Sequence, residues 1–256
     1  MSLTLAARLD GSEAAPLLVL SNSLGTTTRL WEPQLEAFGA RFRVLRHDHP
    51  GHGASPVPRE TVEVEGIARS LLALIDELGA ERFSFCGLSL GGMVGMWLAA
   101  HVPKRVETLT LCSTGARLGR REEWLERAAL VRAEGAGVLV ERQRERWFAA
   151  GFRDSDVAQS YLDELASVPR EGYARCCEAV GAFDFRADVG RIEAPTLVLV
   201  GREDPVTPPE VVELLGEGIA GAETLVVPHA AHLVNLEQPE AVIDAVVRHA
   251  ESRAVA

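Results

Sequence analysis

Arg-Phe-Ser-Phe-Cys-Gly-Leu-Ser-Leu-Gly-Gly, residues 82–92, is the stretch that decides the fold of this chain. An apolar run leads into Ser89, and a helix-compatible stretch over 93–101 follows it. A strand, a very tight turn and a helix are the surroundings in which a serine nucleophile stands exposed above a sheet. Gly87 and Gly91 carry no Cβ atoms that would collide in such a turn. The stretch therefore predicts a strand–turn–helix unit with Ser89 as a candidate nucleophile.

Strands and helices alternate along most of the chain. Short apolar runs typical of strands recur at 16–21, 42–47, 83–87, 106–112, 195–201 and 223–228. Helix-length segments separate several of them, at 62–78, 93–100 and 241–250. This alternation predicts an α/β fold with a mostly parallel, doubly wound sheet and helices on both faces. Residues 3–9 are expected to add an antiparallel edge strand.

One region, residues 117–188, interrupts the alternation. It is rich in Arg, Glu, Ala and Trp and shows helical spacing without a convincing strand. We interpret it as a helical cap inserted into a core made of residues 1–116 and 189–256. Ligands of open α/β sheets bind outside the carboxyl ends of the strands, so a cap at that edge would cover a pocket.

Composition excludes several classes of function. The net charge of −11 argues against nucleic acid or an anionic membrane surface as the main partner. We expect no signal peptide and no transmembrane helix, because no run approaches about 18 apolar residues, and hence a cytoplasmic protein. The four cysteines have no metal-ligand spacing, and no phosphate-binding glycine loop is present, so we expect no metal and no cofactor. The oligomeric state stays open, a homo-oligomer included.

A candidate acid and a candidate base follow Ser89 in chain order. Asp204 ends Leu-Val-Leu-Val-Gly-Arg-Glu-Asp, and His232 ends Val-Val-Pro-His-Ala-Ala-His. A serine hydroxyl needs a base to take its proton, and a carboxylate orients that base. Glu203 and His229 are the competing residues, but loop position after each strand favours Asp204 and His232.

Acyl transfer also needs N–H donors for the oxyanion that develops on the carbonyl. The residue after the nucleophile supplies one, which is the backbone N–H of Leu90. The loop after an early strand supplies the other, and in Leu-Ser-Asn-Ser-Leu-Gly-Thr over 20–26 we choose the N–H of Leu24.

Several motifs together identify a family. Gly-His-Gly-Ala-Ser at 51–55, Gly-Leu-Ser-Leu-Gly-Gly at 87–92, Gly-Arg-Glu-Asp at 201–204 and His-Leu-Val-Asn-Leu-Glu-Gln-Pro at 232–239 resemble the α/β-hydrolase superfamily. Narrower features resemble the 3-oxoadipate enol-lactonases of bacterial aromatic catabolism: Asn-Ser-Leu-Gly-Thr at 22–26, Trp-Glu-Pro-Gln at 31–34, Arg-Trp-Phe at 146–148 and Glu-Gly-Tyr-Ala at 171–174. The likeness runs nearly from end to end.

The resemblance implies hydrolysis of a small anionic enol-lactone by Ser89, His232 and Asp204. The free carboxylate of such a substrate needs a cation, and Arg132 and Arg127 are the candidates because Arg pairs well with carboxylates. Both could instead be solvated charges on a helix face. Trp124 and Trp147 could wall the pocket or simply pack the cap on the core.

Two other functions stay open from the sequence. A general carboxylesterase or a cofactor-free perhydrolase of the same fold would use the same three residues with a different cap pocket. A non-catalytic ligand receptor could retain the fold and the three residues without turnover. A purely structural role is disfavoured, because three catalytic positions are filled in the right order.

Overall fold

A seven-stranded sheet forms the centre of the computed structural model, which describes residues 3–252 except for the side chains of Pro209 and Glu210. The strands lie in the order β1-β3-β2-β4-β5-β6-β7, and every pairing is parallel except that of β1 with β3. Their bounds are β1 (Ala7–Asp10), β2 (Leu17–Ser21), β3 (Arg43–His47), β4 (Phe83–Leu88), β5 (Val106–Cys112), β6 (Thr196–Gly201) and β7 (Glu223–Val227). The predicted mostly parallel sheet is confirmed, and the antiparallel edge strand covers Ala7–Asp10 rather than 3–9.

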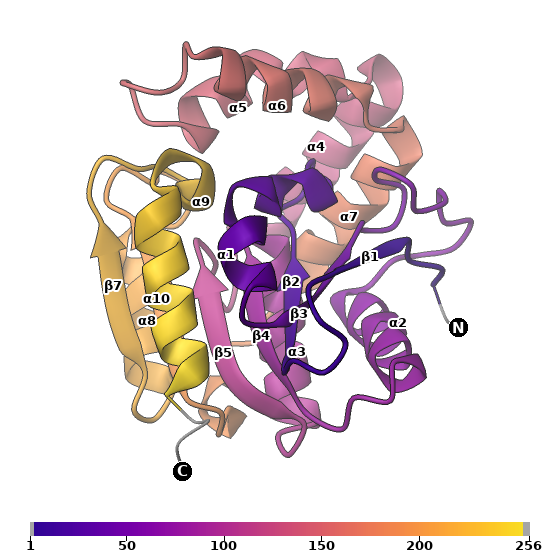
Figure 1. The fold of residues 1–256 in the computed structure, drawn as a ribbon. Coiled ribbons are helices and arrows are strands. Elements are labelled where there is room, and N and C mark those ends of the chain that lie inside the picture. The colour runs from indigo at the N-terminus through magenta and orange to yellow at the C-terminus, as the bar shows by residue number, and fades with distance from the viewer. Residues whose placement is uncertain (1–2, 253–256) are drawn as a thin grey trace.

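Helices cover both faces of the sheet, as a doubly wound fold requires (Figure 1). The short α1 (Leu35–Gly39) and α10 (Pro239–Glu251) lie on one face, and α2 (Val64–Glu77), α3 (Leu90–His101) and α8 (Pro209–Gly218) lie on the other. Helix α3 is buried along nearly its whole length, since it packs on β2, β4 and β5. Within residues 3–252, no helix is long and apolar enough to cross a membrane.

A second group of helices lies between β5 and β6 in the sequence. It contains α4 (Arg121–Glu134), the 3₁₀ turn η2 (Ala136–Leu139), α5 (Val140–Trp147), α6 (Asp156–Ser167) and α7 (Arg170–Ala182). Figure 1 shows α4, α5 and α6 beyond the end of the sheet toward which the arrows of β5 and β7 point. We propose that residues 117–188 form the cap and that 1–116 and 189–256 form the core, of which 1–2 and 253–256 lie outside the described residues.

The strands that lead to the site are buried on both faces. Every residue of β2, β4 and β6 is buried, which is typical of central strands in a parallel sheet. Because neighbouring parallel strands end at the same edge, the loops after β2, β4 and β6 meet there, under the second group of helices. This edge is where the candidate residues come together.

Candidate active site

Ser89 occupies a strained turn between β4 and α3. Its backbone has φ +56° and ψ −111°, a conformation that a residue with a Cβ rarely adopts. Two bonds from β5 and its following loop hold it there: Ser89 N–H donates to the carbonyl of Cys112 at 2.9 Å, and Thr114 Oγ1 donates to the carbonyl of Ser89 at 2.7 Å. Strain that the surroundings hold in place is typical of a functional position.

Two glycines allow the turn to close. A Cβ on Gly87 would lie 2.3 Å from the carbonyl oxygen of Gly91, and a Cβ on Gly91 would lie 2.2 Å from the carbonyl oxygen of Ser21. Both contacts are against backbone, which cannot turn aside as a side chain can. The close approach of backbone to backbone therefore explains the glycine on each side of Ser89.

We expect Gly91→Ala to destabilise the fold by about 3 kcal/mol, because the added methyl group would push the end of β2 away from α3. Urea unfolding measures the change. Gly151→Ala is the matched control, since nothing lies within 4 Å of a Cβ built there. A Gly91→Ala variant as stable as the Gly151→Ala variant would contradict this reading of the turn.

The loop over residues 22–26 lies against the turn. Gly91 N–H donates to the carbonyl of Asn22 at 3.0 Å, which ties the loop after β2 to the start of α3. Among the described residues, the amides of Leu24 and Leu90 donate to no other group of the chain. Leu90 is the first residue of α3, where an N–H has no acceptor within the helix. Both predicted oxyanion donors therefore lack a partner among the described residues, and their role as oxyanion donors stays a prediction.

Asp204 and His232 form a buried pair. His232 Nδ1 lies 3.0 Å from Asp204 Oδ2, and the carboxylate also accepts bonds from Val206 N–H at 2.7 Å, Thr207 N–H at 3.2 Å and the Thr207 hydroxyl. Burial opposes ionisation of Asp204, but the charge of His232 and these hydrogen bonds together hold its pKa below the usual value. A carboxylate bound to Nδ1 leaves Nε2 of the imidazole available to serve as the base.

Glu203 and His229, the competing candidates for acid and base, lie outside this buried pair. Glu203 and His229 are both exposed, whereas Asp204 is 7% and His232 is 2% exposed. His232 and Ser89 line the same pocket, although the described structure has no hydrogen bond between them. The geometry thus favours the acid and base that the sequence indicates.

A pocket of about 370 Å³ opens above Ser89 and His232. Leu24 lines it from the core side, and Arg127, Trp124 and Trp147 line it from the helices between β5 and β6. Six polar residues of these helices also line it and were not predicted from the sequence: Glu123, Glu126, Arg142, Gln143, Arg146 and Tyr173.

The pocket is lined by three arginines and by two glutamates, Glu123 and Glu126, and it has polar atoms without partners. Nε and Nη2 of Arg127 are buried and, among the described residues, have no hydrogen-bond partner, and the same holds for the Tyr173 hydroxyl and for Oε1 of Gln143. The guanidinium of Arg127 lies 5.4 Å from the centre of the Tyr173 ring. Burial lowers the pKa of Arg146, and the nearby charges of Arg142 and Arg127 lower it further. Arg127, with two unsatisfied donors and two further arginines nearby, is suited to bind an anion.

Arg132 requires a correction. Its Nε and Nη2 donate to the two carboxylate oxygens of Glu171 at 2.7 and 3.0 Å, and its Nη1 donates to Glu178. These bonds join α4 to α7, and Arg132 is not among the residues that line the pocket. Its charge is already compensated by two carboxylates, so Arg127 is the better candidate for binding a substrate carboxylate.

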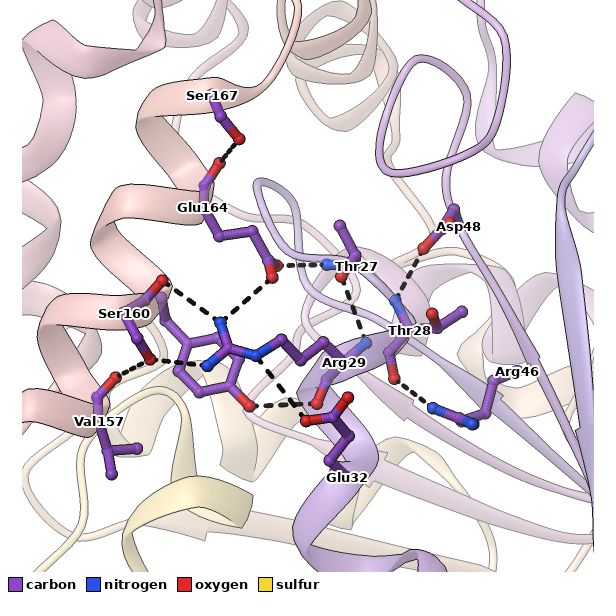
Figure 2. Close-up of polar contacts among 11 residues, drawn as sticks. Thr27, Thr28, Arg29, Glu32, Arg46, Asp48, Val157, Ser160, Glu164 and Ser167 are labelled. Atoms are coloured by element: carbon purple, nitrogen blue, oxygen red, sulfur yellow. Dashed lines mark hydrogen bonds and ion pairs between the residues drawn. The ribbon is translucent and has the colours of Figure 1, made fainter.

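A polar junction ties α6 to the segment just after the loop over 22–26 (Figure 2). Glu164 on α6 accepts a bond from Thr27 N–H at 2.9 Å, and Arg29 donates to Ser160 Oγ at 2.8 Å. From the opposite side, Asp48 accepts a bond from Thr28 N–H at 2.7 Å. Residues 27–29, which follow the loop with Leu24, are therefore held by the core and by α6 together.

Comparison with known proteins agrees with this geometry. Residues 16–239 match the family described as alpha/beta hydrolase fold, and the chain belongs to that family of hydrolases. It is 38% identical over 233 residues to 3-oxoadipate enol-lactonase 2 of Acinetobacter baylyi, a match that covers 90% of this chain and 87% of the relative. The resemblance that the motifs indicated is confirmed.

Two solved structures are similar over nearly the whole chain. The enol-lactonase from Burkholderia xenovorans LB400 has a TM-score of 0.92 at 39% identity, covering 96% of this chain and 95% of that one. A hydrolase from Pseudomonas aeruginosa PA01 has a TM-score of 0.91 at 43% identity, covering 96% and 93%.

Proposed function

We propose that this protein hydrolyses 3-oxoadipate enol-lactone to 3-oxoadipate, a step of bacterial aromatic catabolism. The observation that carries the proposal is that Nε and Nη2 of Arg127 have no hydrogen-bond partner among the described residues, in a pocket that Ser89 and His232 also line. An acyl-transfer site beside a buried cation fits an ester that bears a carboxylate. The names of the similar proteins point to the same substrate. A cytoplasmic location is part of the proposal.

The reaction begins with attack of Ser89 Oγ on the lactone carbonyl carbon. The serine proton passes to Nε2 of His232, while Asp204 holds the imidazole through Nδ1 and stabilises the imidazolium that forms. The amides of Leu24 and Leu90 donate to the oxyanion, and each such donor typically contributes about 3–4 kcal/mol to transition-state stabilisation.

The ring then opens and the acyl-enzyme is hydrolysed. As the carbon–oxygen bond of the ring breaks, His232 returns its proton to the departing enol oxygen. A water molecule gives a proton to His232 and attacks the acyl carbon. The bond from that carbon to Ser89 Oγ then breaks, His232 returns the proton to Oγ, and the new carboxylate is released. The enol of the product rearranges to the ketone, and this step draws the reaction forward without a cofactor.

Cap residues bind and enclose the substrate in this account. Arg127 pairs with its free carboxylate, with Arg142 and Arg146 adding positive potential, while Trp124 and Trp147 wall the pocket. The test is to incubate the protein with the enol-lactone and follow 3-oxoadipate by mass spectrometry. The proposal would be overturned if 3-oxoadipate formed no faster with the protein than in buffer alone.

We expect Arg127→Met to lower kcat/KM for the enol-lactone by about 10- to 100-fold, the value of one or two hydrogen bonds to a charged group. Methionine keeps much of the side-chain volume and removes the charge. Hydrolysis of p-nitrophenyl acetate, which has no carboxylate, should change by less than about three-fold. Arg121→Met is the matched control on an exposed position of the same helix. An equal loss on both substrates would show that Arg127 does not recognise the carboxylate.

A further inference from the structure

The carboxylate of Glu237 connects two segments of the site that are far apart in the sequence. Glu237 ends the short helix α9 (Val234–Glu237) and is 8% exposed. One of its oxygens accepts a bond from Ala231 N–H at 2.6 Å, and the other accepts a bond from Ala149 N–H at 2.8 Å. Ala231 directly precedes His232, whereas Ala149 lies just beyond the end of α5.

The residue on the other side of His232 is tied to the same segment. Leu233 N–H donates to the carbonyl of Trp147 at 3.0 Å. Both neighbours of His232 are therefore fastened to residues 147–149, Leu233 directly and Ala231 through Glu237. Trp147 also lines the pocket above Ser89, so the same short segment borders both the pocket and the loop of His232.

We propose that Glu237 is a positioning residue that holds His232 in register with Ser89 by binding its loop to residues 147–149. The inference rests on the proposed function, since it assumes that His232 is the base. A carboxylate suits this place because each oxygen accepts one N–H. Glutamine would offer one oxygen and turn its NH₂ group toward the second N–H donor, which breaks one of the two bonds.

The pKa of Glu237 shows that ionising a carboxylate at this place opposes folding. Burial raises its pKa to about 7, with smaller contributions from the charges of Glu203 and Asp204, while the bonds from Ala231 and Ala149 act in the opposite direction. Residues 147–149 carry no charged side chain. Between about pH 4.5 and pH 7 the unfolded chain ionises this group before the folded chain does, so its contribution to stability falls as the pH rises. A carboxylate kept where ionisation opposes folding is more typical of function than of stability.

The test compares Glu237→Gln and Glu237→Asp with the wild type and with Glu65→Gln, an exposed ion-pair glutamate on α2. We expect Glu237→Gln to lower kcat for the enol-lactone by about 10- to 100-fold, because a small misplacement of a catalytic group has effects of this size. Asp is one methylene shorter and should lose one of the two bonds, so its kcat should also fall. Glu65→Gln should keep kcat within about two-fold of the wild type.

Two further measurements separate positioning from simple loss of structure. The melting temperature of Glu237→Gln relative to the wild type should rise as the pH increases from about 5 to 8, since the variant lacks the buried charge. The downfield proton resonance of the His232 Nδ1–H bond to Asp204 should shift or broaden in Glu237→Gln and stay unchanged in Glu65→Gln. Nothing in this spectrum depends on the substrate.

The outcomes separate the two proposals. If the wild type does not turn over the lactone but the resonance still responds to Glu237→Gln, the proposed function fails and the positioning role stands. If Glu237→Gln keeps both the wild-type resonance and a kcat within about two-fold of the wild type, the positioning role is overturned.

Discussion

Ser89→Ala should lower kcat for the enol-lactone by about 10⁴-fold or more, because it removes the atom that forms the acyl-enzyme. The fold should be unaffected, since alanine keeps the Cβ in the strained turn, whose bonds to Cys112 and Thr114 involve only the backbone of residue 89. Residual rate above the buffer reaction would come from the oxyanion donors and from binding. Steady-state kinetics compares kcat of the variant with that of the wild type, and circular dichroism compares their folds.

Covalent labelling provides an independent readout of the same variant. A fluorophosphonate should label the wild type and fail to label Ser89→Ala. A variant that loses labelling but keeps kcat within about ten-fold of the wild type would contradict the acyl-enzyme. It would favour water activated directly by His232. Absence of labelling and of turnover in the wild type would instead favour a ligand receptor.

Asp204→Asn should lower kcat by about 10⁴-fold at neutral pH, as loss of the orienting carboxylate does in other triads. The N–H groups of Val206 and Thr207 both donate to Oδ1, so the oxygen of asparagine would stay at that position. The amide nitrogen would then take the place of Oδ2, facing Nδ1 of His232 and the Thr207 hydroxyl. The imidazole would then carry its proton on Nε2, where it cannot accept one from Ser89.

The pH dependence of stability gives this substitution a second signature. Because the pKa of Asp204 is below its usual value in the folded protein, the ionised carboxylate stabilises the fold at neutral pH, and this contribution is lost as the pH falls through the folded pKa. Asp204→Asn lacks that contribution, so the stability difference between variant and wild type should shrink in acid. Glu203→Gln, next to it and exposed, is the matched control and should change kcat by less than about three-fold. If the two variants had equal kcat values, Asp204 would not be the acid of the triad.

The order of strands and the turn at Ser89 could be predicted from the sequence because local signals determine them. Near-continuous apolar runs mark strands buried on both faces, and Gly87 and Gly91 mark a turn with no room for side chains. Asp204 and His232 could be predicted because each follows a strand whose carboxyl end meets that of β4. In each case the catalytic residue lies within a few positions of the strand or turn pattern that predicts it.

The residue that faces the pocket from α4 could not be predicted. Arg127 and Arg132 are five residues apart, which is about 140° around a helix, so they point to different sides. Helix α4 carries charge around most of its circumference and buries only Ala128 and Val131, so its apolar stripe is too narrow to fix its orientation. Arg142 and Arg146 of α5 were missed because the sequence over 140–147 does not show which of its charged residues line a pocket.

Glu237 could not be predicted either, because its role depends on distant contacts. Its bond to Ala149 joins residues that are 88 positions apart. In the sequence it lies in the motif His-Leu-Val-Asn-Leu-Glu-Gln-Pro at 232–239, and that motif does not show which amides its carboxylate binds. Only the arrangement of α5 against the His232 loop brings the two amides to one carboxylate.

The most direct test of the account is the ratio of kcat/KM for the enol-lactone to kcat/KM for p-nitrophenyl acetate, measured on the wild-type protein at neutral pH. Because Ser89 and Arg127 line one pocket and two donors of Arg127 have no partner among the described residues, we predict a preference of about 100-fold or more for the anionic lactone. A protein that hydrolyses the simple ester equally well or better would contradict the claim that this site is built for a carboxylate-bearing lactone.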